Sequence, residues 1–405
     1  MKAAGTYLTP SDGGRPSRRH RIRRATALAG VPMSIGLAAL AAAPPSAAQP
    51  GTQIGGITMQ SKGSPASANV IVSLADFTAA VRADRTVKTE RVSFKNGNIT
   101  MAGVLFAPAN LVPGRRYPAI VVVHPAGGIK EQTASLYAFR LAQNGYIALA
   151  YDASHQGESS GEPRLIEDPT ARVEDVRSAV DYLTTLPLVD REQIAALGIC
   201  AGGGYAINAT ITEHRIKAVA GVSAFNMGDG FRKGWRATEP VEKQLETLQN
   251  AAQQRTAEAN GAQPAMLPYV PDSTEGVTEP DMVEASEYYR QANRWRHENS
   301  PNRFLNSSTD KIYAFDAFDR IDTLLTQPLL LIAGSDAGSK WHSDRAYALA
   351  KTEKELFVIQ GGTHMSLYDR DVGKAMPKLL EFFGKHLNSV TADGRAEGAA
   401  LEVVK

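Results

Sequence analysis

The chain has 405 residues, of which 43% are hydrophobic and 21% charged, so it is long enough to bury a large core. Residues 1–48 carry seven Lys or Arg and one Asp, and without them the formal net charge changes from +2 to −4. This balance gives no reason to expect a nucleic-acid partner. The single cysteine, Cys200, excludes an internal disulfide, so stability has to come from packing and backbone hydrogen bonds.

Residues 1–48 are typical of an export signal peptide, because arginines precede a mostly apolar stretch and small residues follow at 46–48. The pair Arg18-Arg19 also resembles a twin-arginine signal, which would mean transport of the folded protein. An uncleaved membrane anchor is the alternative, but Pro32 interrupts the apolar stretch, and small residues rather than leucine dominate it. We therefore expect cleavage, no stable membrane insertion, and a periplasmic or secreted protein.

After a lead-in at 49–86, which contains a short predicted helix at 70–83, strands and helices alternate over residues 87–387. A β-hairpin is predicted at 87–94 and 99–106. The further predicted strands are 119–124, 146–151, 193–199, 216–222, 328–333 and 355–359, and the predicted helices are 134–144, 173–186, 201–212, 341–351 and 372–387. Continuous apolar runs suit strands that are buried on both faces, so the pattern predicts an α/β fold with a mostly parallel central sheet flanked by helices.

The alternation breaks at about 223–327, a polar stretch that we interpret as a mainly helical cap inserted over the strand ends. Its aromatic side chains either line a pocket or form the cap's own core. They are Trp235, Tyr269, Tyr288, Tyr289, Trp295, Phe304, Tyr313 and Phe315. A polar C-terminal tail follows at 388–405.

Cys200 lies where the predicted strand 193–199 runs into the predicted helix 201–212, in the segment Gly-Ile-Cys-Ala-Gly. A strand that leads into G-x-nucleophile-x-G is the pattern of a nucleophile elbow, in which a tight turn presents one reactive side chain. The helix dipole and backbone N–H groups at that position favour thiolate over thiol. The alternative is an inert buried thiol, since unpaired cysteine is often buried.

A base and an acid for this nucleophile are expected in loops at strand ends, in the chain order nucleophile, acid, base. His364 follows the predicted strand 355–359 and is the candidate base. Asp336 follows the strand 328–333 and is the favoured acid, with Asp344 as its rival. His155 and His342 stay open as other histidines near the site.

The oxyanion of an acyl-transfer reaction needs two backbone N–H donors. The residue after the nucleophile, Ala201, supplies one. The loop after the first buried strand, His-Pro-Ala-Gly-Gly at 124–128, supplies the other through Ala126, because Pro125 has no N–H. No phosphate-binding loop and no cluster with metal-ligand spacing is present in the sequence, so we expect neither a cofactor nor a metal.

Three motifs in order, His124–Gly128, Gly198–Tyr205 and Gly362–Asp369, resemble the α/β-hydrolase superfamily over about residues 87–387. The nearest resemblance is to dienelactone-hydrolase-like proteins and to bacterial relatives of fungal polyketide transferases. It implies a Cys200-His364-Asp336 triad that hydrolyses esters or lactones. The predicted export signal and the long insertion depart from the compact intracellular dienelactone hydrolases, so the resemblance does not carry over a substrate.

The residues together predict an exported hydrolase that cleaves a small-molecule carboxylic ester, lactone or thioester through an acyl-cysteine intermediate. Acyl transfer or peptidase activity at the same site stays open. So does a catalytically silent protein that binds a ligand with this fold, because a fold does not determine function. The sequence does not indicate an oligomeric state.

Overall fold

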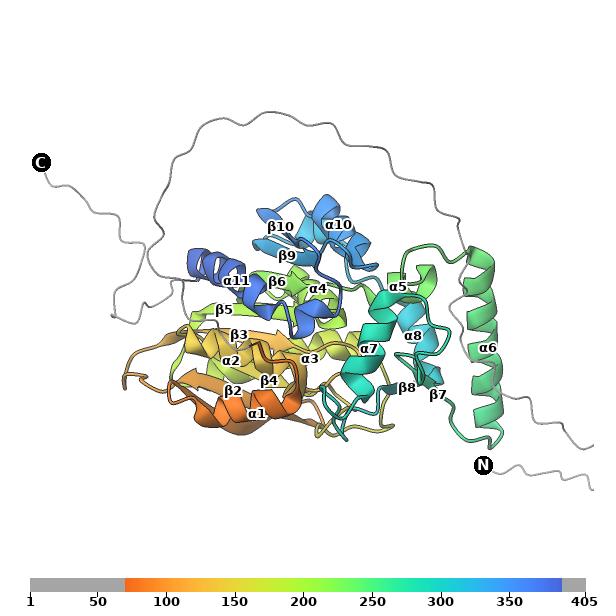
Figure 1. Ribbon diagram of the computed structural model, residues 1–405, viewed down its shortest axis with the longest axis horizontal. Helices are drawn as coiled ribbons and strands as arrows, with labels where there is room; N and C mark the ends of the chain where they lie inside the picture. The colour runs from red at the N-terminus through yellow and green to blue at the C-terminus, as the bar shows by residue number, and fades with distance from the viewer. Residues whose placement is uncertain (1–69, 388–405) are drawn as a thin grey trace, which may run out of the picture. The chain divides into compact units, whose positions relative to one another are not determined.

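The computed structural model describes residues 70–387 (Figure 1). The predicted export signal at 1–48, the lead-in up to residue 69 and the tail at 388–405 lie outside the described residues. Within residues 70–387, no helix is long and apolar enough to cross a membrane.

The strands and helices follow the predicted order closely. The strands are β1 (Val87–Asn96), β2 (Ile99–Pro108), β3 (Tyr117–Val123), β4 (Ile147–Tyr151), β5 (Val189–Ile199), β6 (Ile216–Val222), β7 (Met266–Pro268), β8 (Arg303–Leu305), β9 (Leu329–Gly334) and β10 (Lys354–Ile359). The α-helices are α1 (Leu74–Ala83), α2 (Ser135–Gln143), α3 (Pro169–Thr185), α4 (Ala201–Thr212), α5 (Met227–Lys233), α6 (Val241–Ala259), α7 (Pro280–Arg290), α8 (Thr309–Ala314), α9 (Ile321–Leu324), α10 (Lys340–Leu349) and α11 (Val372–His386). Three short helical turns, η1 (Lys130–Ala134), η2 (Asn306–Ser308) and η3 (Ser366–Tyr368), complete the set.

Eight strands form one sheet in the order β1-β2-β4-β3-β5-β6-β9-β10. The β1–β2 and β2–β4 pairs are antiparallel, and every pair from β4 to β10 is parallel. The parallel strands β3, β4 and β9 are buried along their whole length, as the continuous apolar runs predicted. The predicted α/β-hydrolase fold, a mostly parallel sheet flanked by helices, is confirmed.

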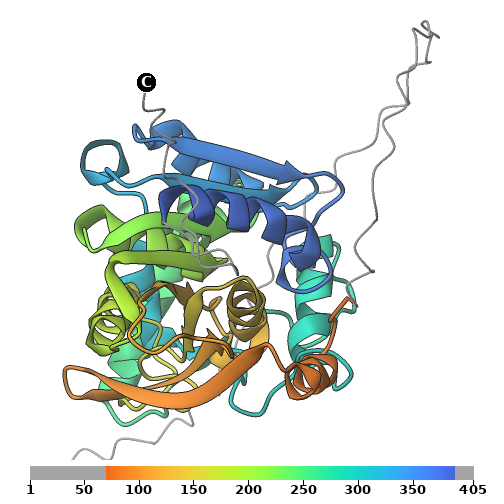
Figure 2. The same ribbon diagram turned by 90° about the vertical axis from the view of Figure 1, so that its left-hand side faces the viewer.

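Helices cover both faces of this sheet. On one face, α2 packs on β2 and β4, and α11 packs on β6, β9 and β10 and contacts α2 (Figure 2). The other set of helices comprises α3 and α4, which pack on β5 and on each other, and α10, which packs on β9 and β10. Because helices and strands bury their apolar sides together, the carboxyl ends of β3, β5, β9 and β10 are held at one edge of a rigid sheet, where the candidate site lies.

The chain between β6 and β9 contains α5 to α9 and the antiparallel pair β7–β8, and we call this interval the cap. In Figure 1, α5 to α8 and the β7–β8 pair gather at one end of the sheet, with α6 farthest out. No residue of α6 is buried, whereas α7 buries six residues of the segment 280–290. Helix α6 packs on α5, α8 and η2, which also belong to the cap, whereas α9 packs on α4 and α10 of the body and α7 reaches the body through the Asp281 carboxylate.

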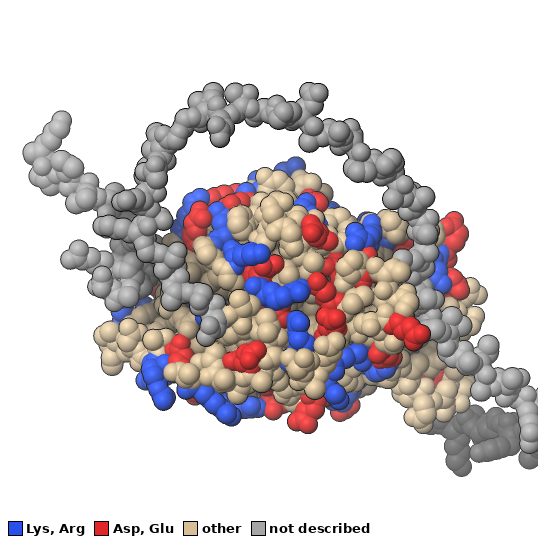
Figure 3. All heavy atoms as spheres, in the orientation of Figure 1, with Lys and Arg blue, Asp and Glu red and all other residues tan. Residues whose placement is uncertain are grey.

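Acidic and basic side chains alternate over the face of the described residues that is visible in Figure 3. The basic side chains do not form one extended stripe on that face.

Candidate active site

Cys200 lies in the tight turn between β5 and α4, with φ 55° and ψ −125°. A positive φ is uncommon for a residue with a side chain and is tolerated here because the turn is tightly packed. A Cβ at Gly198 would lie 2.1 Å from the Gly202 carbonyl oxygen, and a Cβ at Gly202 would lie 2.2 Å from the Val123 carbonyl oxygen. Both glycines are therefore required by the close approach of the backbones, and the turn has the geometry that the motif predicted.

The thiol is nearly enclosed: Cys200 is 9% exposed. Burial raises its pKa to about 11, although the Tyr368 hydroxyl and the N–H groups of Ala201 and Ala126 interact with the sulfur and lower the pKa. The sequence predicted a site that favours thiolate, and this expectation is wrong, because desolvation outweighs the helix N-terminus. At neutral pH the thiol is protonated.

The structure brings the two predicted oxyanion donors together. Ala201 is the first residue of α4, and Ala126 lies in the loop after β3, yet the backbone N–H groups of both face the same sulfur. An oxygen on a carbon bonded to this sulfur would lie beside both donors. His124, in the same loop, is buried and has a structural role: its Nδ1 lies 2.7 Å from the Pro125 carbonyl oxygen, and its Nε2 accepts the Ala153 N–H at 3.0 Å.

His364 lies in the loop after β10 and is 1% exposed. Its Nε2 is 3.3 Å from the hydroxyl oxygen of Tyr368, and its Nδ1 is 2.5 Å from Oγ of Ser339. Burial lowers the pKa of the imidazole to about 4, against the opposing effect of the Asp281 carboxylate. The ring is therefore neutral at pH 7 and able to accept a proton.

Tyr368 connects the thiol to the imidazole. Its hydroxyl interacts with the Cys200 sulfur and lies within hydrogen-bonding distance of His364 Nε2. Tyr289, from cap helix α7, interacts with the same hydroxyl. Burial and the nearby thiol hold the pKa of Tyr368 well above its usual range, so the phenol keeps its proton. Tyr368 lies within the motif Gly362–Asp369, to which the sequence assigned no role beyond that of His364. Its position four residues after His364 is the only local signal that marks it.

The predicted acid does not reach the imidazole. Asp336 is exposed, and its Oδ1 accepts a hydrogen bond of 2.7 Å from the Ser335 hydroxyl. The loop after β9 turns this side chain outward, and Ser339, three residues later, meets Nδ1 of His364 instead. The prediction that Asp336 orients the base is therefore corrected by the structure.

Asp344, the rival acid, is also exposed, and its carboxylate pairs with Lys340 along α10 at 2.6 Å. The carboxylate that does approach His364 belongs to Asp281 at the start of α7, and it is 1% exposed. Its Oδ1 accepts the backbone N–H of His364 at 3.0 Å. Its Oδ2 accepts the N–H of Gly338 at 2.7 Å and Nε1–H of Trp235 at 2.8 Å. No local motif marks Asp281 in the sequence.

The two other histidines that the sequence left open do not contact the thiol. His155 is on the surface, with Nδ1 3.1 Å from the Pro163 carbonyl oxygen. His342 is buried beside Phe225, with ring centroids 4.3 Å apart, and burial lowers its pKa well below the usual range. It stays neutral and helps to fill the space behind His364.

Two cap aromatics contact the candidate catalytic residues. The Trp235 ring lies edge-on to His364, with centroids 4.8 Å apart, and Tyr289 interacts with Tyr368. Phe304 packs on Phe231 and Tyr269 inside the cap, as the alternative of a cap core predicted. Trp295 instead is buried against Phe77 of α1, which lies outside the cap. The enclosure of the thiol is thus partly built by the cap.

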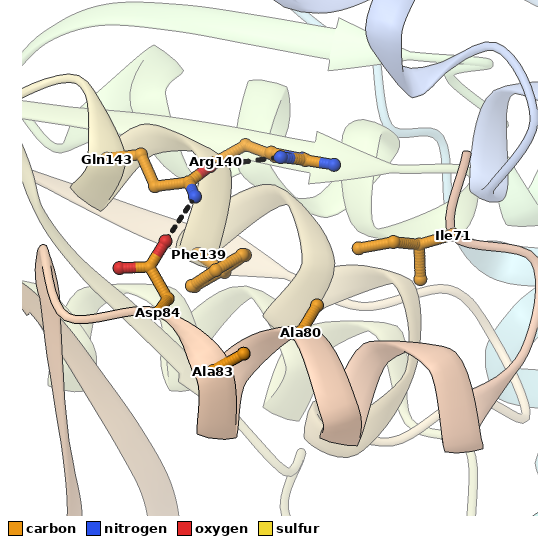
Figure 4. Close-up of a pocket in the computed structure, with 7 residues that line it drawn as sticks. All are labelled: Ile71, Ala80, Ala83, Asp84, Phe139, Arg140 and Gln143. Carbon is orange, nitrogen blue, oxygen red and sulfur yellow. Dashed lines mark hydrogen bonds between the residues drawn. The ribbon is translucent and has the colours of Figure 1, made fainter. Parts of the chain in front are cut away.

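A separate hollow of about 300 Å³ lies between α1 and α2, away from these residues (Figure 4). Its polar side chains bond to one another: Gln143 donates to Asp84 at 2.7 Å, and Arg140 donates to Gln143 at 3.1 Å. Among residues 70–387, no group of three or more His, Cys, Asp or Glu is arranged to hold a metal ion.

The model of the dienelactone hydrolase family matches residues 101–251. The uncharacterized protein YcjY of Escherichia coli (strain K12) is 41% identical over 303 residues, which cover 73% of this chain and 99% of the relative. The thiohydrolase aneE of Aspergillus aculeatus is 26% identical over 223 residues, 54% of this chain and 69% of the relative.

Among solved structures, the hypothetical protein PA2218 from Pseudomonas aeruginosa is 35% identical. It superposes with a TM-score of 0.71 and covers 75% of this chain and 95% of that one. The predicted resemblance to dienelactone-hydrolase-like α/β hydrolases is confirmed by these matches.

Proposed function

Because the chain belongs to the dienelactone hydrolase family, an α/β-hydrolase type of enzyme, we propose that it hydrolyses a small-molecule ester, lactone or thioester through an acyl-Cys200 intermediate. The observation that carries the proposal is the elbow itself: Cys200 holds a positive φ, and two backbone N–H groups face its sulfur. An inert core cysteine needs neither feature.

The first half of the proposed reaction forms the acyl-enzyme. The sulfur attacks the substrate carbonyl carbon as the thiol proton passes to the Tyr368 oxygen and the Tyr368 proton passes to Nε2 of His364. The carbonyl electron pair moves onto oxygen, where the N–H groups of Ala126 and Ala201 donate to it. Collapse expels the alkoxide or thiolate, which takes the proton from His364.

The second half regenerates the thiol. Neutral His364 accepts a proton from water as that water attacks the acyl carbon. The C–S bond then breaks, and the sulfur regains its proton through Tyr368. Because burial raises the pKa of the thiol and lowers that of the imidazole, this pair exchanges a proton during attack rather than resting as an ion pair.

Thioesters are the substrates that we place first within this proposal. The relative aneE is named a thiohydrolase, and a thiol exchanges with a thioester without a large change in leaving-group basicity. Short acyl thioesters, p-nitrophenyl esters and lactones, assayed in parallel, would rank the three classes.

The decisive experiment compares wild type with Cys200→Ala and Cys200→Ser on that panel. We expect Cys200→Ala to lower kcat/KM by at least about 10³-fold and to abolish the acyl adduct that mass spectrometry detects on the peptide containing residue 200. Equal rates in wild type and Cys200→Ala would refute the proposal. If no substrate of the panel is turned over and alkylation of Cys200 follows the usual thiol pKa, a catalytically silent ligand-binding protein would be favoured.

We also propose that the protein is exported by the twin-arginine route, on the basis of Arg18, Arg19 and the apolar stretch that follows. Expression in a bacterium with that route, followed by cell fractionation, tests it. Replacement of both arginines by lysine should leave the precursor in the cytoplasm, whereas unchanged export would contradict the twin-arginine assignment.

A further inference from the structure

We propose that Ser339 and the cap residue Asp281 together position His364, doing the work that the sequence assigned to Asp336. This inference rests on the proposed function, since it concerns the base of that reaction. Ser339 would set the ring orientation by direct contact, and Asp281 would hold both loops and supply the negative charge. Both are positioning residues, because they act through the imidazole.

Ser339 makes the direct contact with the ring. It precedes α10, is 2% exposed, and its Oγ lies 2.5 Å from Nδ1 of His364. In the proposed arrangement the Ser339 hydroxyl oxygen accepts a hydrogen bond from Nδ1–H, which would place the neutral ring's lone pair on Nε2. Nε2 faces Tyr368, so this tautomer is the one that receives the proton from the thiol side.

Asp281 holds the two loops that carry this contact. One carboxylate oxygen accepts the backbone N–H of His364, and the other accepts the N–H of Gly338, the neighbour of Ser339. Trp235 donates a third hydrogen bond to the carboxylate and places its ring edge-on to His364. The carboxylate therefore fixes the backbone on both sides of the Ser339–His364 contact.

Asp281 also supplies a charge that a serine hydroxyl lacks. Its carboxylate raises the pKa of His364 against burial, and it thereby stabilises the imidazolium that forms during attack. The other titratable or charged groups around this pair are Tyr368 on the histidine's own loop, His342 on α10, Glu284 on α7, which accepts a hydrogen bond from Thr363, and Arg236 of the cap. The hydrogen bond with Glu279 and, to a smaller degree, the Asp281 charge raise the pKa of Arg236. Cys200 lies beyond Tyr368.

One consequence is that the base is incomplete without the cap. Asp281 and Trp235 both belong to the segment between β6 and β9, whereas His364 and Ser339 belong to the body.

The test uses the full chain and three variants: Asp281→Asn, Ser339→Ala and, as the matched control, Asp336→Asn. We expect Asp281→Asn and Ser339→Ala to lower kcat/KM by about 10- to 100-fold, and Asp336→Asn to stay within about 2-fold of wild type. A loss in Asp336→Asn as large as in Ser339→Ala would overturn the proposal. Thermal unfolding identifies any variant that does not fold. Ser339→Ala removes only one oxygen atom, so we expect this variant to fold.

A second measurement does not depend on turnover. With ¹⁵N-labelled histidine, NMR reads the tautomer and the titration midpoint of His364. Removal of the Asp281 charge should move that midpoint to lower pH, because the imidazolium loses its counter-charge, whereas a purely structural role would leave the midpoint unchanged. Ser339→Ala should change the Nδ1–H tautomer signal. If Asp281→Asn leaves the midpoint in place, this inference fails even when Cys200 is catalytic; if Cys200→Ala retains turnover, the proposed function fails instead.

Discussion

The elbow that carries Cys200 and the cap that carries Asp281 are held by different kinds of interaction. The elbow lies between a buried strand and a buried helix, and its glycines leave no room for a methyl group. Asp281 reaches His364 across 83 residues of sequence through hydrogen bonds of its side chain. Backbone packing thus determines where the Cys200 sulfur lies, while side-chain hydrogen bonds determine the position and orientation of the His364 ring.

This difference predicts that the elbow tolerates the least change. Gly202→Ala should place a Cβ 2.2 Å from the Val123 carbonyl oxygen, a clash with backbone that the neighbouring strand cannot relieve cheaply. We expect a loss of several kcal/mol, about 3 or more, or failure to fold, measured by chemical unfolding. Gly373→Ala is the control, since a Cβ there meets nothing within 4 Å in α11 and should be neutral or slightly stabilising. Equal stability of the two variants would show that the turn can open.

The bridge between thiol and imidazole is the next strongest test. Tyr368→Phe removes the hydroxyl that contacts both the Cys200 sulfur and His364 Nε2 while it keeps the ring. If the proton passes through this hydroxyl, kcat/KM should fall by about 10- to 100-fold with little change in unfolding free energy. The exposed Tyr347, changed to Phe, controls for loss of a phenol. Wild-type turnover in Tyr368→Phe would mean that His364 reaches the thiol directly.

Much of the body was predictable because its signals are local. Apolar runs such as 119–123 predicted buried strands, and the glycines around Cys200 predicted the turn. His364 was found by its place after β10, and Ala126 by elimination of Pro125. Each of these inferences needs only residues that are close along the chain.

The acid and the thiol pKa were predicted wrongly for one shared reason. Asp336 occupies the customary strand-end loop, but the loop conformation turns it outward, and the carboxylate that replaces it comes from a cap without periodic sequence pattern. The helix N-terminus at Cys200 favours thiolate, but the aromatics that enclose it, such as Tyr289 and Tyr368, come from distant segments. Both errors lie where distant parts of the chain meet.

The enclosure of the thiol makes a pH-dependent prediction. Because burial raises the pKa of Cys200 to about 11, the thiolate fraction is small at neutral pH and rises as the pH rises toward that value. The rate of alkylation by iodoacetamide should therefore keep increasing with pH through about pH 10, without the plateau that a free thiol reaches above a pKa of about 8.5. A plateau near pH 7 would show that a thiolate–imidazolium pair forms without substrate.

The outer helix of the cap should give the smallest effect. Leu245 on α6 is 62% exposed, and no residue of this helix is buried, so Leu245→Ser removes almost no packing. We expect the free energy of unfolding to change by less than about 0.5 kcal/mol. Leu331→Ala in the fully buried strand β9 is the contrast and should cost about 2–5 kcal/mol. If Leu245→Ser destabilises the protein to a similar extent, α6 is packed against another surface in solution. The stability of the cap would then depend on α6 as well as on α7.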